Sequence, residues 1–297
     1  MIIEAWVLWT LLAAGMQSVR TAGQKQLAEV VSPLTATLVR YLFGLPFAWL
    51  YLAFLAEPRN WQFPELNGIF LWSGFLAGIL QIAATILLIR LFSMRNFAVG
   101  TTFVRSEILL TALIGVVFFT EQISLMGWIA MFASVGGLIL ISVAKQDGIG
   151  SLWNLSAAFG LSAGLAFALT SLFLRQASLS FGIDDAVFSA AITLVYMVTL
   201  QTVICLVLVG IWKPQELLQL KGLLKPAVFV GVTSVLGSAG WFTAMTLQSA
   251  SYVKTLGQVE FLITLMLSIF YFKEKPTSME LLGMSLIVLG AVLLLLT

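Results

Sequence analysis

The sequence predicts an all-α membrane protein: a polytopic helical bundle of ten transmembrane helices, arranged as two inverted five-helix repeats. Three observations predict this fold. The 297 residues are 60% hydrophobic and only 9% charged, whereas an average soluble domain carries about 25% charged residues. Apolar runs of about 20 residues, each long enough to cross a bilayer as a helix, recur along the chain. A segment of the first half also recurs in the second half.

The apolar runs are joined by short connections that leave no room for an attached soluble domain. Most prolines fall at or between run ends, where a missing backbone N–H is tolerated. Pro46 lies deep inside the second run and predicts a kink there. The ten predicted spans are 3–22, 33–55, 66–89, 97–119, 123–143, 152–174, 184–211, 222–247, 251–272 and 278–296.

The polar composition excludes several classes of function. A net charge of +2 from scattered basic residues does not indicate nucleic-acid binding. The chain has no histidine, and Cys205 is its only cysteine, so the sequence predicts no disulfide, metal site or cofactor. No catalytic dyad is discernible either, and we therefore expect no enzymatic activity.

An internal repeat organises the chain. At an offset of 153 residues, the segment 107–140 superimposes on 260–293 without a gap, and Glu107 falls on Glu260. A weaker offset of 150 extends the correspondence to the whole first half, which predicts one repeat over 1–147 and a second over 148–297. Because five helices form an odd-numbered unit, the two copies must enter the membrane in opposite senses.

The repeated stretches SEILLTALIGVVFFTEQ and VEFLITLMLSIFYFKEK contain two matched acids each. Both resemble the end of an EamA-type repeat of the drug/metabolite transporter superfamily, which reads Leu-Glu-Pro, an apolar helix, then Gly-Glu-Lys/Arg. Glu107 and Glu260 match the first acid of that signature, and Glu121 and Glu274 match the second. The resemblance implies ten helices, two EamA domains and proton-linked or exchange transport of metabolites, often the export of amino acids.

The chain departs from that signature at four positions, which makes the resemblance one to the superfamily rather than to a subfamily. Ile108 and Phe261 stand where the family has proline, and Thr120 and Lys273 replace the glycine before the second acid. Glu121 and Glu274 start the turns before the fifth and tenth spans, so we interpret them as helix caps there.

Glu107 and Glu260 are the two acids placed deep inside predicted spans. Burying an ionised carboxylate in a membrane is costly, so such residues usually face a bundle interior and are often functional. The hypothesis is that both bind protons or substrate. The alternative is an interhelical hydrogen bond that only holds the bundle together. Thr111 and Thr264 follow the acids by four residues and therefore share their helix faces.

Arg105 and Arg40 are the basic residues expected well inside spans. Either guanidinium could bind a substrate carboxylate or phosphate, or could extend its charged end to a lipid headgroup. Four further polar or aromatic residues are candidates for the wall of a central site, although each could equally bridge helices or pack. They are Gln17, Gln81, Trp241 and Gln258.

The orientation of the termini is indicated in two conflicting ways. The connections on the membrane side opposite the termini hold ten Lys and Arg residues, and those on the same side as the termini hold three. The positive-inside rule then places both termini outside the cytoplasm, whereas the family resemblance implies that they lie inside.

Together these observations predict a secondary active transporter that exports a small polar metabolite, such as an amino acid, by alternating access that is either proton-linked or driven by exchange. The alternative is an efflux carrier for lipophilic cations, with the buried carboxylates as counter-charges. The expected partners are a small-molecule substrate, the lipid bilayer and, where transport is proton-linked instead of driven by exchange, protons, with no nucleic acid. We expect a multi-pass protein of the bacterial inner membrane, as a monomer or homodimer.

Overall fold

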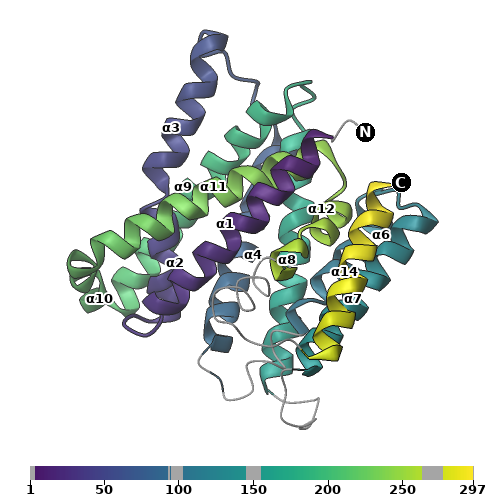
Figure 1. Cartoon of the computed structure of the whole chain (residues 1–297). Coiled ribbons are helices and arrows are strands. Elements are labelled where there is room, and N and C mark those ends of the chain that lie inside the picture. The colour runs from purple at the N-terminus through teal and green to yellow at the C-terminus, as the bar shows by residue number, and fades with distance from the viewer. Residues whose placement is uncertain (1–3, 93, 95–102, 145–154, 263–276, 297) are drawn as a thin grey trace.

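A computed structural model describes residues 4–92, 94, 103–144, 155–262 and 277–296, and every regular element in these ranges is helical (Figure 1). The start of the first helix and the end of the last lie at the same end of the bundle (Figure 1). The elements are α1 (Ala5–Leu27), α2 (Pro33–Leu42), α3 (Leu45–Ala56), the 3₁₀ turn η1 (Glu57–Arg59), α4 (Gly68–Phe92), α6 (Glu107–Phe118), α7 (Leu125–Ala144), α8 (Leu155–Leu179), α9 (Ala186–Trp212), α10 (Pro214–Gln219), the 3₁₀ turn η2 (Leu220–Leu223), α11 (Leu224–Leu247), α12 (Ala250–Leu256) and α14 (Ser278–Leu295).

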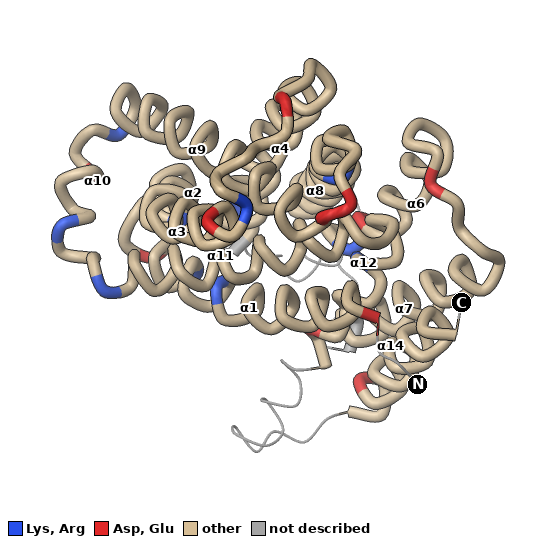
Figure 2. The backbone as a smooth tube through the Cα atoms, turned by 90° about the horizontal axis from the view of Figure 1, so that it is seen from above, with Lys and Arg blue, Asp and Glu red and all other residues tan. Residues whose placement is uncertain are grey.

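Seven helical stretches within the described ranges are long and apolar enough to cross a membrane. Large apolar side chains cover their outer faces, as shown by Phe54 and Ile211, which are 74% and 67% exposed. Charged positions are sparse along the helices (Figure 2). Such a surface is suited to lipid. The seven stretches are 33–59, 68–91, 125–142, 155–179, 186–212, 214–247 and 278–295.

The three other predicted spans are described as shorter or more polar helices. The first span corresponds to α1, which carries Arg20 and Lys25. The fourth is described over its second part, where α6 forms a short apolar helix, and the ninth over its first part, which contains α12.

The helices α7 and α14 cross in an antiparallel sense along a line of small residues, and they lie side by side in Figure 1. A Cβ added to Gly137 would lie 2.4 Å from the carbonyl oxygen of Gly283, and one added to Gly290 would lie 2.6 Å from that of Ala130. At the repeat offset of 153, Ala130 corresponds to Gly283 and Gly137 to Gly290. The two contacts are therefore exchanged by a local twofold relation between the repeats.

Two further antiparallel helix pairs obey the same relation. Gly240 on α11 packs against the Trp9 carbonyl of α1, while Gly23 near the other end of α1 packs against Val230. α1 and α11 are therefore antiparallel. α4 and α8 are also antiparallel, since Asn67 bonds to the Ser180 carbonyl and Ser73 to Gln176. Under the repeat, the first of these pairs maps onto the second.

The predicted kink in the second span is present as a two-residue turn at 43–44 that divides the helical stretch. α2 ends at Leu42, and α3 starts at Leu45 with Pro46 in its first turn. The break also lets the chain approach α11 closely, because a Cβ on Gly231 would lie 2.5 Å from the Phe43 carbonyl carbon.

The fourth and ninth spans were predicted as continuous helices, and this was wrong in the described residues. The helix is interrupted by a turn at 105–106 in the first repeat and at 257–258 in the second. At both places backbone bonds span three residues, as in Ile108 N to Arg105 O and Glu260 N to Gly257 O. Glu107 thus follows its break directly and Glu260 follows its break by two residues, where tightened helical geometry often marks a functional site.

Candidate functional site

A polar cavity of about 120 Å³ lies between the repeats, next to both interrupted helices. Its wall comes from α1, α2, α4, α6, α8, α11 and α12, together with residues beside the two breaks. Irregular backbone at membrane depth is tolerated where it borders such a cavity, because polar groups there find partners or water. The charged lining residues are Arg20, Arg40, Arg105, Glu107, Lys254 and Glu260.

The two matched acids each contact a side chain of the opposite repeat. Glu107 Oε1 lies 2.5 Å from Lys254 Nζ, at ion-pair distance but without the alignment of a hydrogen bond. The side chains are only 12% and 13% exposed. The Lys254 ammonium also lies 4.8 Å from the centre of the Trp241 ring, a cation–π contact that adds to the stability of the buried charge.

Glu260 is oriented by a chain of hydrogen bonds that crosses from α11 through α1. Trp241 Nε1 donates to Gln17 Oε1 at 2.9 Å, and Gln17 Nε2 donates to Glu260 Oε2 at 2.8 Å. Gly257 makes this arrangement possible, because a Cβ there would lie 2.3 Å from the Trp241 ring. The Gln17 amide is therefore held in one orientation, with its donor facing the carboxylate.

Three arginines face the same cavity. Arg40 Nη1 donates to Thr85 Oγ1 at 3.3 Å, and the Arg105 guanidinium lies 4.0 Å from the centre of the Phe261 ring. Arg105 also interacts electrostatically with both carboxylates. Arg20 is 7% exposed, and its Nε has no hydrogen-bond partner among the described residues.

The structure brings seven of the predicted site residues to one cavity and places two elsewhere. Thr111 Oγ1 donates to the Glu107 carbonyl within α6, and Gln258 Nε2 donates to the Lys254 carbonyl, so neither lines the cavity. Thr264 lies outside the described residues. The seven that line the cavity are Gln17, Arg40, Gln81, Arg105, Glu107, Trp241 and Glu260.

Sequence reasoning missed two charged lining residues, Arg20 and Lys254. Both lie near the ends of apolar runs, and we therefore assigned them to connections. The signal that could have found Lys254 is its place just before Gly257 in a run that also carries Glu260.

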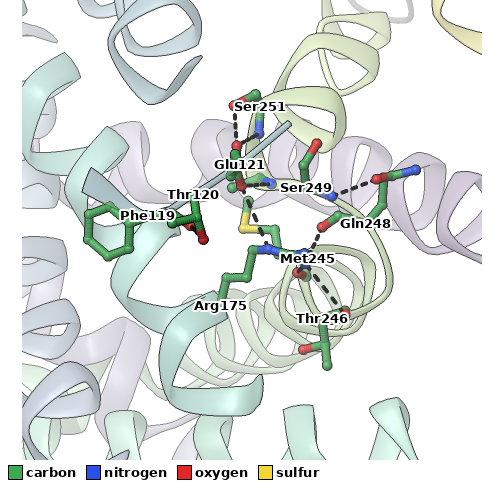
Figure 3. Close-up of polar contacts among 10 residues, drawn as sticks. Phe119, Thr120, Glu121, Arg175, Met245, Thr246, Gln248, Ser249 and Ser251 are labelled. Atoms are coloured by element: carbon green, nitrogen blue, oxygen red, sulfur yellow. Dashed lines mark hydrogen bonds and ion pairs between the residues drawn. The ribbon is translucent and has the colours of Figure 1, made fainter. Parts of the chain in front are cut away.

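A second polar cluster joins the turn after α6 and the end of α8 to the segment between α11 and α12 (Figure 3). Arg175 Nη1 donates to the carbonyls of Met245 and Gln248, the latter at 2.6 Å, and thereby caps the end of α11. Its Nε lies 3.7 Å from Glu121 Oε1. Because the side chains of Leu174 and Met245 line the cavity, this cluster lies directly behind the cavity wall.

Glu121 caps a helix, although not the one predicted. Its Oε1 accepts from Ala250 N at 2.7 Å and its Oε2 from Ser251 Oγ at 2.5 Å, so it caps α12 of the other repeat instead of the adjacent α7 (Figure 3). The interpretation as an α7 cap was wrong because the turn directs the side chain away from α7. Glu274 lies outside the described residues. We call Glu121, Arg175 and the 245–251 segment the latch.

Thr120 explains why the family signature has glycine before the second acid. Its φ is +55°, a left-handed conformation that a β-branched residue adopts only at a cost. Its hydroxyl bonds to the neighbouring Phe119 carbonyl and is exposed, so the side chain contributes little in return.

Thr120→Gly is therefore expected to raise the free energy of unfolding by about 1 kcal/mol. Thermal unfolding of the purified protein in detergent measures the change. Ser285→Gly, at an exposed site within α14, is the control and should lower stability by about 0.5–1 kcal/mol. Equal destabilisation by both substitutions would contradict the assignment of strain to Thr120.

The fold and the cavity together define a multi-pass helical membrane protein with a polar site between two similar halves. Comparison with known families adds the assignment: the model of the EamA-like transporter family matches residues 4–143 and 154–296. The chain belongs to the EamA-like transporter family, and thus to the membrane transporters of the drug/metabolite transporter superfamily.

Solved structures support the same fold. In all, 28 solved chains match this one. One, described only as the crystal structure of a protein, has a TM-score of 0.70 at 13% sequence identity, over 97% of this chain and 98% of its own. At that identity the likeness shows the fold alone. Among curated proteins the comparison finds no significant match.

Proposed function

We propose that this protein is a secondary active transporter that exports a small polar metabolite, such as an amino acid, across the bacterial inner membrane. The observation that carries the proposal is the polar cavity between the repeats, with the matched acids Glu107 and Glu260 in its wall. Each acid contacts a side chain of the opposite repeat, Lys254 or Gln17. A movement of one repeat against the other therefore changes the surroundings of both carboxylates, as alternating access requires.

The latch contacts are consistent with a conformation in which the cavity is closed at one end of the bundle. It joins the turn after α6 and the end of α8 to the segment between α11 and α12. Because α11 runs antiparallel to α1, this segment lies at the end of the bundle where α1 starts. In the proposed cycle the latch opens when the cavity becomes accessible from that end.

The size of the cavity favours a metabolite over the alternative of a lipophilic cation. Sites for drug-sized ligands have volumes of about 300–1,000 Å³, whereas this cavity has about 120 Å³. Aromatic rings do face it, including Trp241 and Phe167, but Lys254 already lies over both rings.

Counterflow in proteoliposomes tests the proposal. Vesicles containing the protein are preloaded with unlabelled amino acids and organic acids, and uptake of each radiolabelled compound is measured with and without a pH gradient. We expect trans-stimulated uptake of at least one compound. In Glu260→Gln, which keeps an acceptor oxygen at the Gln17 contact, the response to the gradient should fall at least tenfold while exchange persists. Absence of counterflow for every compound would refute transport, and an unchanged gradient response would refute proton coupling through Glu260.

A further inference from the structure

Among the described residues that line the central cavity, cations outnumber carboxylates. Among the lining residues, the cations Arg20, Arg40, Arg105 and Lys254 face the carboxylates Glu107 and Glu260. Lys254 and Glu107 form an ion pair with each other. Three guanidiniums therefore share the charge of one further carboxylate.

Arg20 and Arg40 carry most of this excess. In the part of the chain that the structure describes, no carboxylate lies within 4.0 Å of either guanidinium. Arg20 is repelled by Arg40 and attracted by Glu260. The two side chains are 7% and 4% exposed, so water screens them little. Two buried cations that line one cavity are costly unless an anion joins them.

The internal repeat duplicates the two acids but does not duplicate these arginines. Glu107 and Glu260 occupy equivalent positions, but the offset of 150 places Thr170 and Ala190 opposite Arg20 and Arg40. Since the twofold relation does not reproduce the arginines, they mark one side of the cavity as the place for a negative group. Duplicated acids suit a task common to both halves, whereas unduplicated cations suit recognition of an asymmetric substrate.

The geometry points to a small anion, with a carboxylate or phosphate group bound between Arg20 and Arg40, as the substrate class of this carrier. The inference deepens the proposed transport function and rests on it. The free Nε of Arg20 supplies a hydrogen-bond donor within the planar fork that matches such oxyanions. Arg105, beside the break before Glu107, lies across the same cavity and can contact a second acidic group.

Isothermal titration of the purified full chain in detergent tests the inference with four probes: succinate, inorganic phosphate, L-serine and tetraphenylphosphonium. We expect saturable binding of succinate or phosphate, at least tenfold tighter than binding of serine or the cation. Arg20→Met and Arg40→Met should each weaken anion binding about tenfold or more. Lys25→Met, which removes an exposed charge from the same helix as Arg20, should leave it unchanged.

A variant that keeps the charge covers the case in which Arg20→Met does not fold. Arg20→Lys loses the planar fork and should bind the anion more weakly than wild type, with unchanged thermal stability in the absence of ligand. Tighter binding of serine or tetraphenylphosphonium, or unchanged anion affinity in the Arg20 variants, would overturn the inference and leave transport standing. Anion binding without counterflow of any compound would instead refute transport while the site remained.

Discussion

Replacing Glu107 with glutamine should lower the free energy of unfolding by about 3–5 kcal/mol, the cost of leaving a buried charge without its partner. The Lys254 ammonium is only 13% exposed and lies 2.5 Å from the Glu107 carboxylate. Without that carboxylate, Glu260 is the one acid that faces Lys254 and three arginines among the described lining residues. Thermal or denaturant unfolding in detergent measures the loss.

The matched control removes both charges. The double variant Glu107→Gln/Lys254→Met nearly keeps the volumes of both side chains. It also restores the wild-type excess of cations over carboxylates in the cavity lining, so the free energy of unfolding should recover to within about 1 kcal/mol of wild type. Lys254→Met alone should be milder than Glu107→Gln, because it reduces the positive excess. A double variant no more stable than Glu107→Gln would show that the two side chains are not coupled.

Breaking the latch should expose the cavity from the end of the bundle where α1 starts. Arg175 binds the carbonyls at the end of α11, and Glu121 binds the first N–H groups of α12. Arg175→Met therefore removes the side chain that caps the end of α11. It also removes the ion-pair partner of Glu121, which caps α12. We expect at least a tenfold faster reaction of a cavity thiol with a membrane-impermeant reagent added at that end.

The chain offers a simple background for this measurement. Cys205 is the only cysteine, and it is buried on α9 as a small apolar residue, so Cys205→Ala removes the native thiol. Ser238→Cys then places one thiol in the cavity wall. Arg59→Met is the control, since it breaks an ion pair with Asp185 that does not involve the latch. Equal labelling of the Arg175 and Arg59 variants would contradict a gating role.

Hydropathy predicted the helical bundle, and the repeat predicted that Glu107 and Glu260 occupy equivalent positions. Both predictions depend on patterns that extend over many residues. The breaks at 105–106 and 257–258 have no such pattern, since the apolar runs continue through them. Only the i to i−3 backbone bonds reveal them. A hydropathy window averages over the whole span and cannot register a turn of two residues.

The cavity lining was predicted in part for a similar reason. Glu107 and Glu260 stood out because they lie far from any run end, whereas Arg20 and Lys254 lie near run ends and were counted with the connections. The partner of Glu121 could not be predicted either. Its bond to Ala250 joins residues 129 positions apart and depends on how the repeats are packed.

The antiparallel crossing of α7 and α14 has an energetic consequence. Gly137 and Gly290 make equivalent contacts, each against the backbone of the other repeat. If the two repeats exchange conformations, the Gly137 contact takes the place of the Gly290 contact and the reverse. The crossing of α7 and α14 therefore favours neither of the two resting states. Any preference must arise where the repeats differ, such as Thr120 against Lys273 or Arg105 against Gln258. In the proposed transport cycle, those mismatched positions determine which resting conformation the unloaded protein prefers.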